Sequence, residues 1–174
     1  AAPFRQIMPG PRSPEMVYTL IELGLLDAFL KKRMPEPWRL HRLGSIQRKA
    51  MPRWAALCCA LEKFGCIDSA EEFLTALRLD SRTIRCCSNA AVLVKQQKPA
   101  DKAAWKRALC AYGVDSVSCA AQCYDAFSGG GSARELRAVL KSGECFSMKH
   151  LAVTGDDLLE LGLRGRERHA ALPA

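Results

Sequence analysis

Apolar residues recur every three or four positions along most of the chain, which is the spacing of one face of an α-helix. The first such segment starts at Ser13-Pro14-Glu15, where serine suits the N-cap and proline the first turn. Gly24 is the expected end of this helix. Its predicted apolar face consists of Met16, Val17, Leu20, Ile21 and Leu23. No segment alternates with a period of two, so we predict an all-α bundle of roughly eight to ten short helices.

Capping residues divide the rest of the chain. The segment from Trp38 to Ala50 is expected to be helical, and Pro52 to open a helix that ends at Gly65. Two capping boxes are predicted, Asp68-Ser-Ala-Glu71 and Ser132-Ala-Arg-Glu135. The predicted N-caps of the three helices between them are Asp80, Asp101 and Asp115, with Gly113 ending the second.

The run Ser128-Gly-Gly-Gly131 is the one stretch that reads as a flexible linker. It predicts a helical domain over residues 1–128, a linker at 129–131 and a second helical unit over 132–174. Because the chain begins at Ala1 and its end falls within a helical pattern, we expect a piece of a longer protein.

Positive charge is concentrated in one stretch. The formal net charge is +8, and between residues 31 and 53 only Glu36 is acidic. We call the cations of this stretch the basic strip: Lys31, Lys32, Arg33, Arg39, Arg42, Arg48, Lys49 and Arg53. Such a cluster is either a solvated helix face or a surface that binds phosphates or an acidic protein.

The cysteines indicate a reducing compartment. There are nine, an odd number, and the adjacent pairs Cys58-Cys59 and Cys86-Cys87 point apart on a helix. Cys119 and Cys123 have helical spacing, but no second pair completes a zinc site. With no apolar run long enough to span a membrane and no secretion leader, we expect a cytoplasmic protein without membrane contact and with reduced thiols.

The sequence offers no convincing active site. Gly130-Gly-Ser-Ala-Arg-Glu135 superficially resembles the glycine loop of nucleotidyltransferases, but no Asp-x-Asp pair is present to hold metals. The three histidines form no His-Asp dyad and no metal cluster. We therefore predict no catalytic residue and no metal ligand in this chain.

Two stretches together resemble one family. From Gly143 to Glu167 the chain reads as a short apolar turn, then Thr154-Gly-Asp-Asp-Leu158, Gly162-Leu and Gly165-Arg-Glu167. This resembles the start of the tail of bacterial CCA-adding enzymes (tRNA nucleotidyltransferases). Arg53-Trp-Ala-Ala-Leu-Cys-Cys-Ala-Leu61 and the Ala70–Ile84 segment that follows it resemble the body of the same family. Cys59-Ala60 stands where some relatives carry His-Asp.

The resemblance implies the tRNA-binding part of such an enzyme, without the catalytic head. The missing head would use Mg²⁺ with CTP and ATP to add CMP and AMP to the tRNA 3′ end, whereas this chain itself would need no cofactor. The body and tail would hold the tRNA acceptor stem and elbow through backbone contacts. The expected RNA-binding residues are Arg39, Arg42, Arg48, Lys49, Arg53, Lys149, Arg164, Arg166 and Arg168.

Two alternatives remain open from the sequence. One is a helical protein-interaction module of the same fold, with the basic strip meeting an acidic partner. The other is a DNA-binding helical domain, although no helix carries Arg, Asn or Gln at base-reading spacing.

Overall fold

The computed structural model describes residues 7–35 and 37–146, excepting the side chains of residues 37–39. Its described residues form helices and turns, and the predicted all-α class is confirmed for them. The elements are α2 (Ser13–Glu22), η1 (Asp27–Phe29), η2 (Pro37–Ser45), α3 (Ala50–Lys63), α4 (Ala70–Ala76), α5 (Ser81–Lys95), α6 (Lys102–Ser128) and α7 (Ser132–Lys141). Two of these elements, η1 and η2, are 3₁₀ helices, and the α-helices are fewer than the predicted eight to ten helices, in part because two predicted helices join into α6 across a kink at Gly113.

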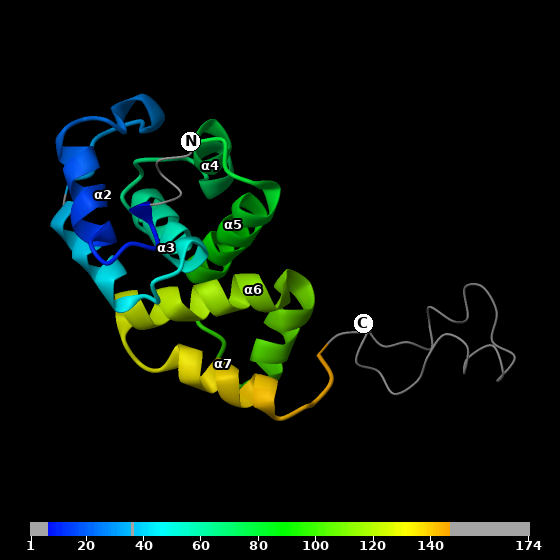
Figure 1. Ribbon diagram of the computed structural model, residues 1–174. Helices are drawn as coiled ribbons and strands as arrows, with labels where there is room; N and C mark the ends of the chain where they lie inside the picture. Colours follow the sequence, from blue (N-terminus) through cyan, green and yellow to red (C-terminus); the bar gives the residue numbers. More distant parts are fainter. Residues whose placement is uncertain (1–6, 36, 147–174) are drawn as a thin grey trace, which may run out of the picture.

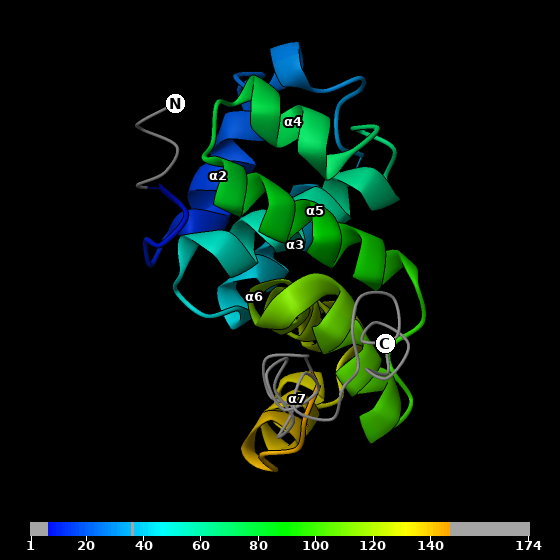
Figure 2. The ribbon, with the colours of Figure 1, turned by 90° about the vertical axis from the view of Figure 1, so that its right-hand side faces the viewer.

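Helix α3 is the centre of the fold. Every residue from 52 to 61 is buried, and the helix packs against α5, α6, α4 and η2. Figure 1 shows α3 with α5 beside it and α6 beneath, and Figure 2 shows α7 on the far side of α6. Alanines at 55, 56 and 60 allow neighbours to approach closely on several sides, while the largest fully buried side chains of the helix are Trp54, Arg53, Leu57 and Leu61.

Helix α2 differs from its prediction in its N-cap residue and in the residues of its buried face. Arg12, not Ser13, is at the N-cap position, and Ser13 is buried with its hydroxyl donating to the Met8 sulfur at 3.6 Å. The helix packs mainly on η2 and buries the narrow stripe Val17 and Ile21. Two residues of the predicted apolar face, Met16 and Leu23, are therefore exposed.

Two predicted N-caps are confirmed. The carboxylate of Asp80 accepts from the Thr83 N–H at 2.9 Å, and that of Asp101 accepts from the Ala104 N–H at 2.7 Å. Both are local contacts across three residues, so the sequence alone contains the information needed to predict them.

Neither predicted capping box forms as expected. At α4 the N-cap is a different residue, and at α7 a different side chain bonds to the first N–H groups. The cap of α4 is Ser69, which accepts from the Glu72 N–H, and Asp68 forms an ion pair with Lys31. At α7, Gly131 is the N-cap residue, and the carboxylate of Asp125 on α6 accepts from the Ser132 and Ala133 N–H groups at 2.5 and 3.0 Å. A distant carboxylate thus replaces the expected serine cap.

The glycine run 129–131 forms a turn in which all three residues have positive φ. Helix α7 folds back on α6, and its Leu136 and Val139 join the same core as α3. The predicted second unit over 132–174 lies mostly outside the described residues.

The basic stretch was expected to be helical from Trp38 to Ala50, and its helical part ends earlier. It forms the 3₁₀ helix η2, which ends at Ser45, and α3 begins at Ala50. Its buried residues Leu40, Leu43 and Ile46 are spaced by three, which is the period of a 3₁₀ helix, so one apolar edge faces the core.

Arg53 is part of the core. Only 1% of its surface is exposed, and its guanidinium donates to the backbone carbonyls of Met8 and Gly10 at 2.9 and 2.6 Å. Burial, and then the positive charge of Arg48, lower its pKa from the ordinary value. This side chain fastens the segment before α2 to the first turn of α3.

We expect Arg53→Ala to lower the free energy of unfolding by roughly 3 kcal/mol, because two backbone carbonyls lose a charged donor and a cavity opens. Arg53→Lys should recover only part of this loss, since an ammonium lacks the planar fork of a guanidinium. Urea denaturation measures both. The matched control is its exposed neighbour Arg48, whose replacement by Ala should change stability by no more than about 0.5 kcal/mol. Equal effects at the two positions would contradict the assigned role of Arg53.

None of the nine cysteines forms a disulfide, and only Cys110 and Cys145 are exposed. Burial raises the pKa of Cys58. A hydrogen bond with Cys59, together with burial, raises that of Cys123. Neutral buried thiols react slowly with alkylating and disulfide reagents.

A thiol-titrating disulfide reagent should therefore label two cysteines rapidly in the folded protein and the other seven only after denaturation. Mass spectrometry after brief labelling identifies the sites. Rapid labelling at Cys58 or Cys123 would show that the core around α3 is open in solution.

Candidate nucleic-acid interface

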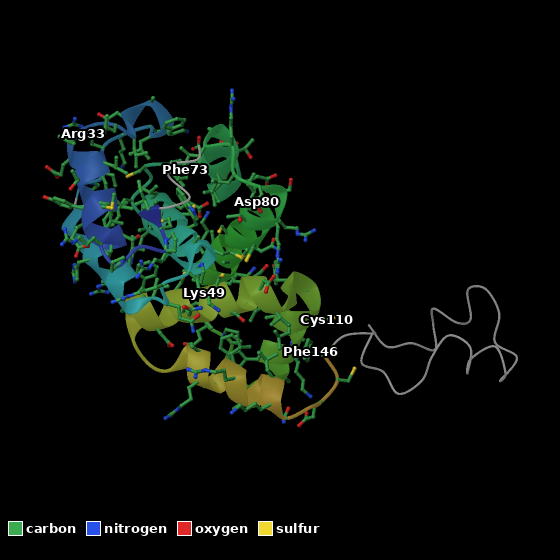
Figure 3. The ribbon with its side chains drawn as sticks, viewed as in Figure 1. Arg33, Lys49, Phe73, Asp80, Cys110 and Phe146 are labelled. Carbon is green, nitrogen blue, oxygen red and sulfur yellow. The ribbon has the colours of Figure 1, made fainter. Side chains whose placement is uncertain are left out.

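The basic strip divides into paired and unpaired cations. Lys31 pairs with Asp68, and Arg33 pairs with Asp27 at 3.1 Å, so their charges are offset by exposed carboxylates. Arg48 and Lys49 are also exposed, but no carboxylate among the described residues pairs with either. Figure 3 shows Arg33 at one corner of the molecule and Lys49 against α6, well apart from it.

The unpaired part of the strip is held along α6. The exposed Arg42 donates from Nη1 to the Phe127 carbonyl at 3.0 Å, near the end of α6. The Gln47 N–H donates to the Gln122 side chain at 3.3 Å. These contacts position the chain between η2 and α3, from which Arg48 and Lys49 project.

Arg137 on α7 extends this positive surface. Together with Lys49 it lines a hollow of about 420 Å³ between α3, α6 and α7. The one carboxylate in that hollow, Asp115, accepts a hydrogen bond from Arg82 at 2.6 Å. Sequence reasoning missed Arg137 because it lies 88 positions after Lys49 and meets it only through the packing of α7 on α6.

Several predicted RNA-binding residues are not part of this surface as described. Arg53 does not belong to the exposed surface, because its side chain is buried and its guanidinium donates to backbone carbonyls. The side chain of Arg39 lies outside the described residues. The same is true of Lys149, Arg164, Arg166 and Arg168.

A pocket of about 470 Å³ opens beside Arg42, where the C-terminal ends of α3, α5 and α6 meet. Lys63, Lys95 and Lys98 line it together with Arg42. We call these four side chains the cationic rim. Lys95 pairs at 3.0 Å with Glu62, the one carboxylate of the lining, and Lys98 pairs at 2.8 Å with Glu135 of α7. Lys63 has no carboxylate partner within the described part of the chain.

Small side chains create the space in this pocket. Ala60 on α3 and Ala91 on α5 leave room that longer side chains would fill. Its aromatic walls are Phe64, Tyr124 and Phe127, and the Tyr124 hydroxyl is already engaged by the Leu93 carbonyl. Cys59 and Cys123 complete the lining, and the raised pKa of Cys123 keeps that thiol neutral at physiological pH.

The electrostatic balance at the pocket remains positive. The lining carries four cations against the single carboxylate of Glu62. The C-cap residues Phe64, Gln96 and Gly129 also line it, so three helix C-termini each contribute about half a negative charge. These partial charges sum to less than the excess of side-chain charge. The sequence does show lysines near the ends of α3 and α5, which could have indicated the cationic rim. It does not show that these two helix ends lie next to each other.

Among the described residues no group of three or more His, Cys, Asp or Glu side chains is placed to hold a metal ion. Within the same part of the chain, no helix is long and apolar enough to cross a membrane. Comparisons of the chain with protein-family models, with curated proteins and with solved structures found no match.

Proposed function

We propose that this chain binds tRNA through the cations between η2 and α3, as the body and start of the tail of a cytoplasmic CCA-adding enzyme. The observation that carries the proposal is a group of exposed cations near the start of α3, Arg42, Arg48 and Lys49, that have no carboxylate partner in the described part of the chain, with Arg137 lining the same hollow as Lys49. Lys32 of the strip also lacks a carboxylate partner there, but it lies apart from them, beside Gly65. Unpaired surface cations attract phosphates without first breaking an ion pair.

The identity of the RNA rests on the sequence resemblance. The body-like stretch from Arg53 to Ile84 forms α3, α4 and the start of α5, so its helical character agrees with the proposed family. In this proposal the parent protein adds CMP and AMP in a separate head, which uses Mg²⁺, CTP and ATP. This chain binds the acceptor stem and elbow of the tRNA. Backbone contacts would carry little sequence information.

The test compares two double variants that remove the same charge from the same stretch. Arg48→Ala with Lys49→Ala removes unpaired cations, whereas Lys31→Ala with Arg33→Ala removes paired ones. Binding of a tRNA minihelix is measured at several salt concentrations. The first variant should weaken binding and lower the salt slope by roughly 1.4 to 1.8, because each phosphate contact contributes about 0.7 to 0.9. The second should leave the slope nearly unchanged.

If affinity and salt slope fell equally in both variants, overall charge, and not contact at Arg48 and Lys49, would set the affinity. An unchanged slope in both would contradict RNA binding by the strip. In that case, binding of a polyglutamate peptide that depends on the same two residues would favour the acidic protein partner.

A further inference from the structure

The pocket beneath the cationic rim combines features that a nucleotide requires. Its volume of about 470 Å³ lies in the range of small-molecule sites, and aromatic and small apolar side chains form much of its wall. Positive charge is confined to the rim, in Arg42, Lys63, Lys95 and Lys98. A ligand that fits this arrangement has a flat apolar body and one anionic group at its edge.

We infer that this pocket binds one unpaired nucleotide, with its phosphate on the cationic rim and its base among Phe64, Tyr124 and Phe127. The inference deepens the proposed function and rests on it for the source of the nucleotide, a single-stranded end of the bound RNA. Arg42 belongs both to the unpaired strip and to the rim, so a strand that follows the strip reaches the pocket.

The polar groups of the pocket support a phosphate at the rim and a base inside. The Oε1 atom of Glu62 accepts from the Ala70 N–H at 2.6 Å, and its Oε2 atom lies 3.0 Å from the Lys95 ammonium, which offsets the negative charge. Lys63, exposed at the end of α3, is then the rim lysine without a carboxylate partner among the described residues. Inside, the Tyr124 hydroxyl is bonded to Leu93, so the ring offers its apolar surface.

Stacking tolerates different bases because every base has a flat π-face. The amide of Gln96 and the hydroxyl of Ser128, both in the lining, can donate to or accept from a base edge. The inferred site is therefore specific for a nucleotide as a class and weakly selective among bases.

The first arm of the test uses 5′-AMP alone, followed by NMR of the backbone amides of Phe64, Gln96 and Gly129, the three C-caps at the pocket. AMP should shift these amides, and inorganic phosphate and adenosine should each bind at least about ten-fold more weakly, because each lacks one half of the contact. Lys63→Glu should weaken AMP binding about ten-fold. Arg107→Glu, an equal charge reversal at an exposed site that does not line the pocket, should leave it unchanged.

The second arm compares a blunt tRNA minihelix with one that carries an unpaired 3′ nucleotide. The unpaired nucleotide should increase affinity by about 5-fold to 160-fold, the range expected for one stacked base. Lys63→Glu, or Ala60→Leu to fill the pocket, should remove this increment while the blunt minihelix still binds. Thermal melting shows whether the Ala60→Leu protein is folded, and the surface variant Lys63→Glu provides the result if it is not.

The outcomes separate the two proposals. If the blunt minihelix does not bind but AMP does, RNA binding is wrong and the pocket is a site for a free mononucleotide. If the unpaired 3′ nucleotide does not increase the affinity of the minihelix, and AMP does not shift the amide signals of the three C-caps, the pocket inference is overturned. RNA binding by the strip would then still stand. Binding of inorganic phosphate as tightly as AMP would also overturn the pocket inference, because the base would then contribute nothing.

Discussion

The structure depends on the burial of α3 on all sides. Its residues from 52 to 61 are covered by four other elements, so those elements are positioned relative to each other by their contact with one helix. A helix buried all round leaves no polar face, and the one charged group it buries there, Arg53, donates from Nη1 to the Met8 and Gly10 carbonyls. The same packing brings the C-terminal ends of α3, α5 and α6 together and produces the pocket.

Some exposed cations of the basic strip form ion pairs with carboxylates, and others have no carboxylate partner in the described part of the chain. Lys31 and Arg33 meet carboxylates and contribute local ion pairs of small energetic value. Arg48 and Lys49 have no such partners in the described part of the chain, and they project from a segment that Gln122 and the end of α6 hold in place. A count of positive charges along the sequence treats both groups alike. The ion pairs distinguish them, and for that reason the functional proposal rests on the second group.

The sequence predicted features whose cause is local. The caps at Asp80 and Asp101 depend on contacts across three residues, and the backbone break at Gly113 on a positive φ that glycine adopts easily. A feature with a cause on another helix was missed, because the first N–H groups of α7 are capped by Asp125 of α6. The cap of α4 lies one residue from its prediction, at Ser69, while Asp68 pairs with Lys31.

The same distinction applies to the candidate site. The strip was visible as a run of cations, but the burial of Arg53 follows from packing around α3 and has no local signal. Lys63, Lys95 and Lys98 meet Arg42 only because three helices end at one place. The three-residue spacing of Leu40, Leu43 and Ile46 fits the 3₁₀ helix η2, but α-helices also place residues i and i+3 on one face, so the pattern predicts a helical segment without its type.

The central claim is that unpaired cations between η2 and α3 form the RNA-binding surface, and amide NMR mapping with a tRNA minihelix tests it most directly. The account predicts that the largest shifts fall between residues 42 and 49 and at Arg137, with small shifts at Lys31 and Arg33. Largest shifts at Lys31 and Arg33, or at the distant Arg82, would contradict it, as would the absence of any shift at low salt.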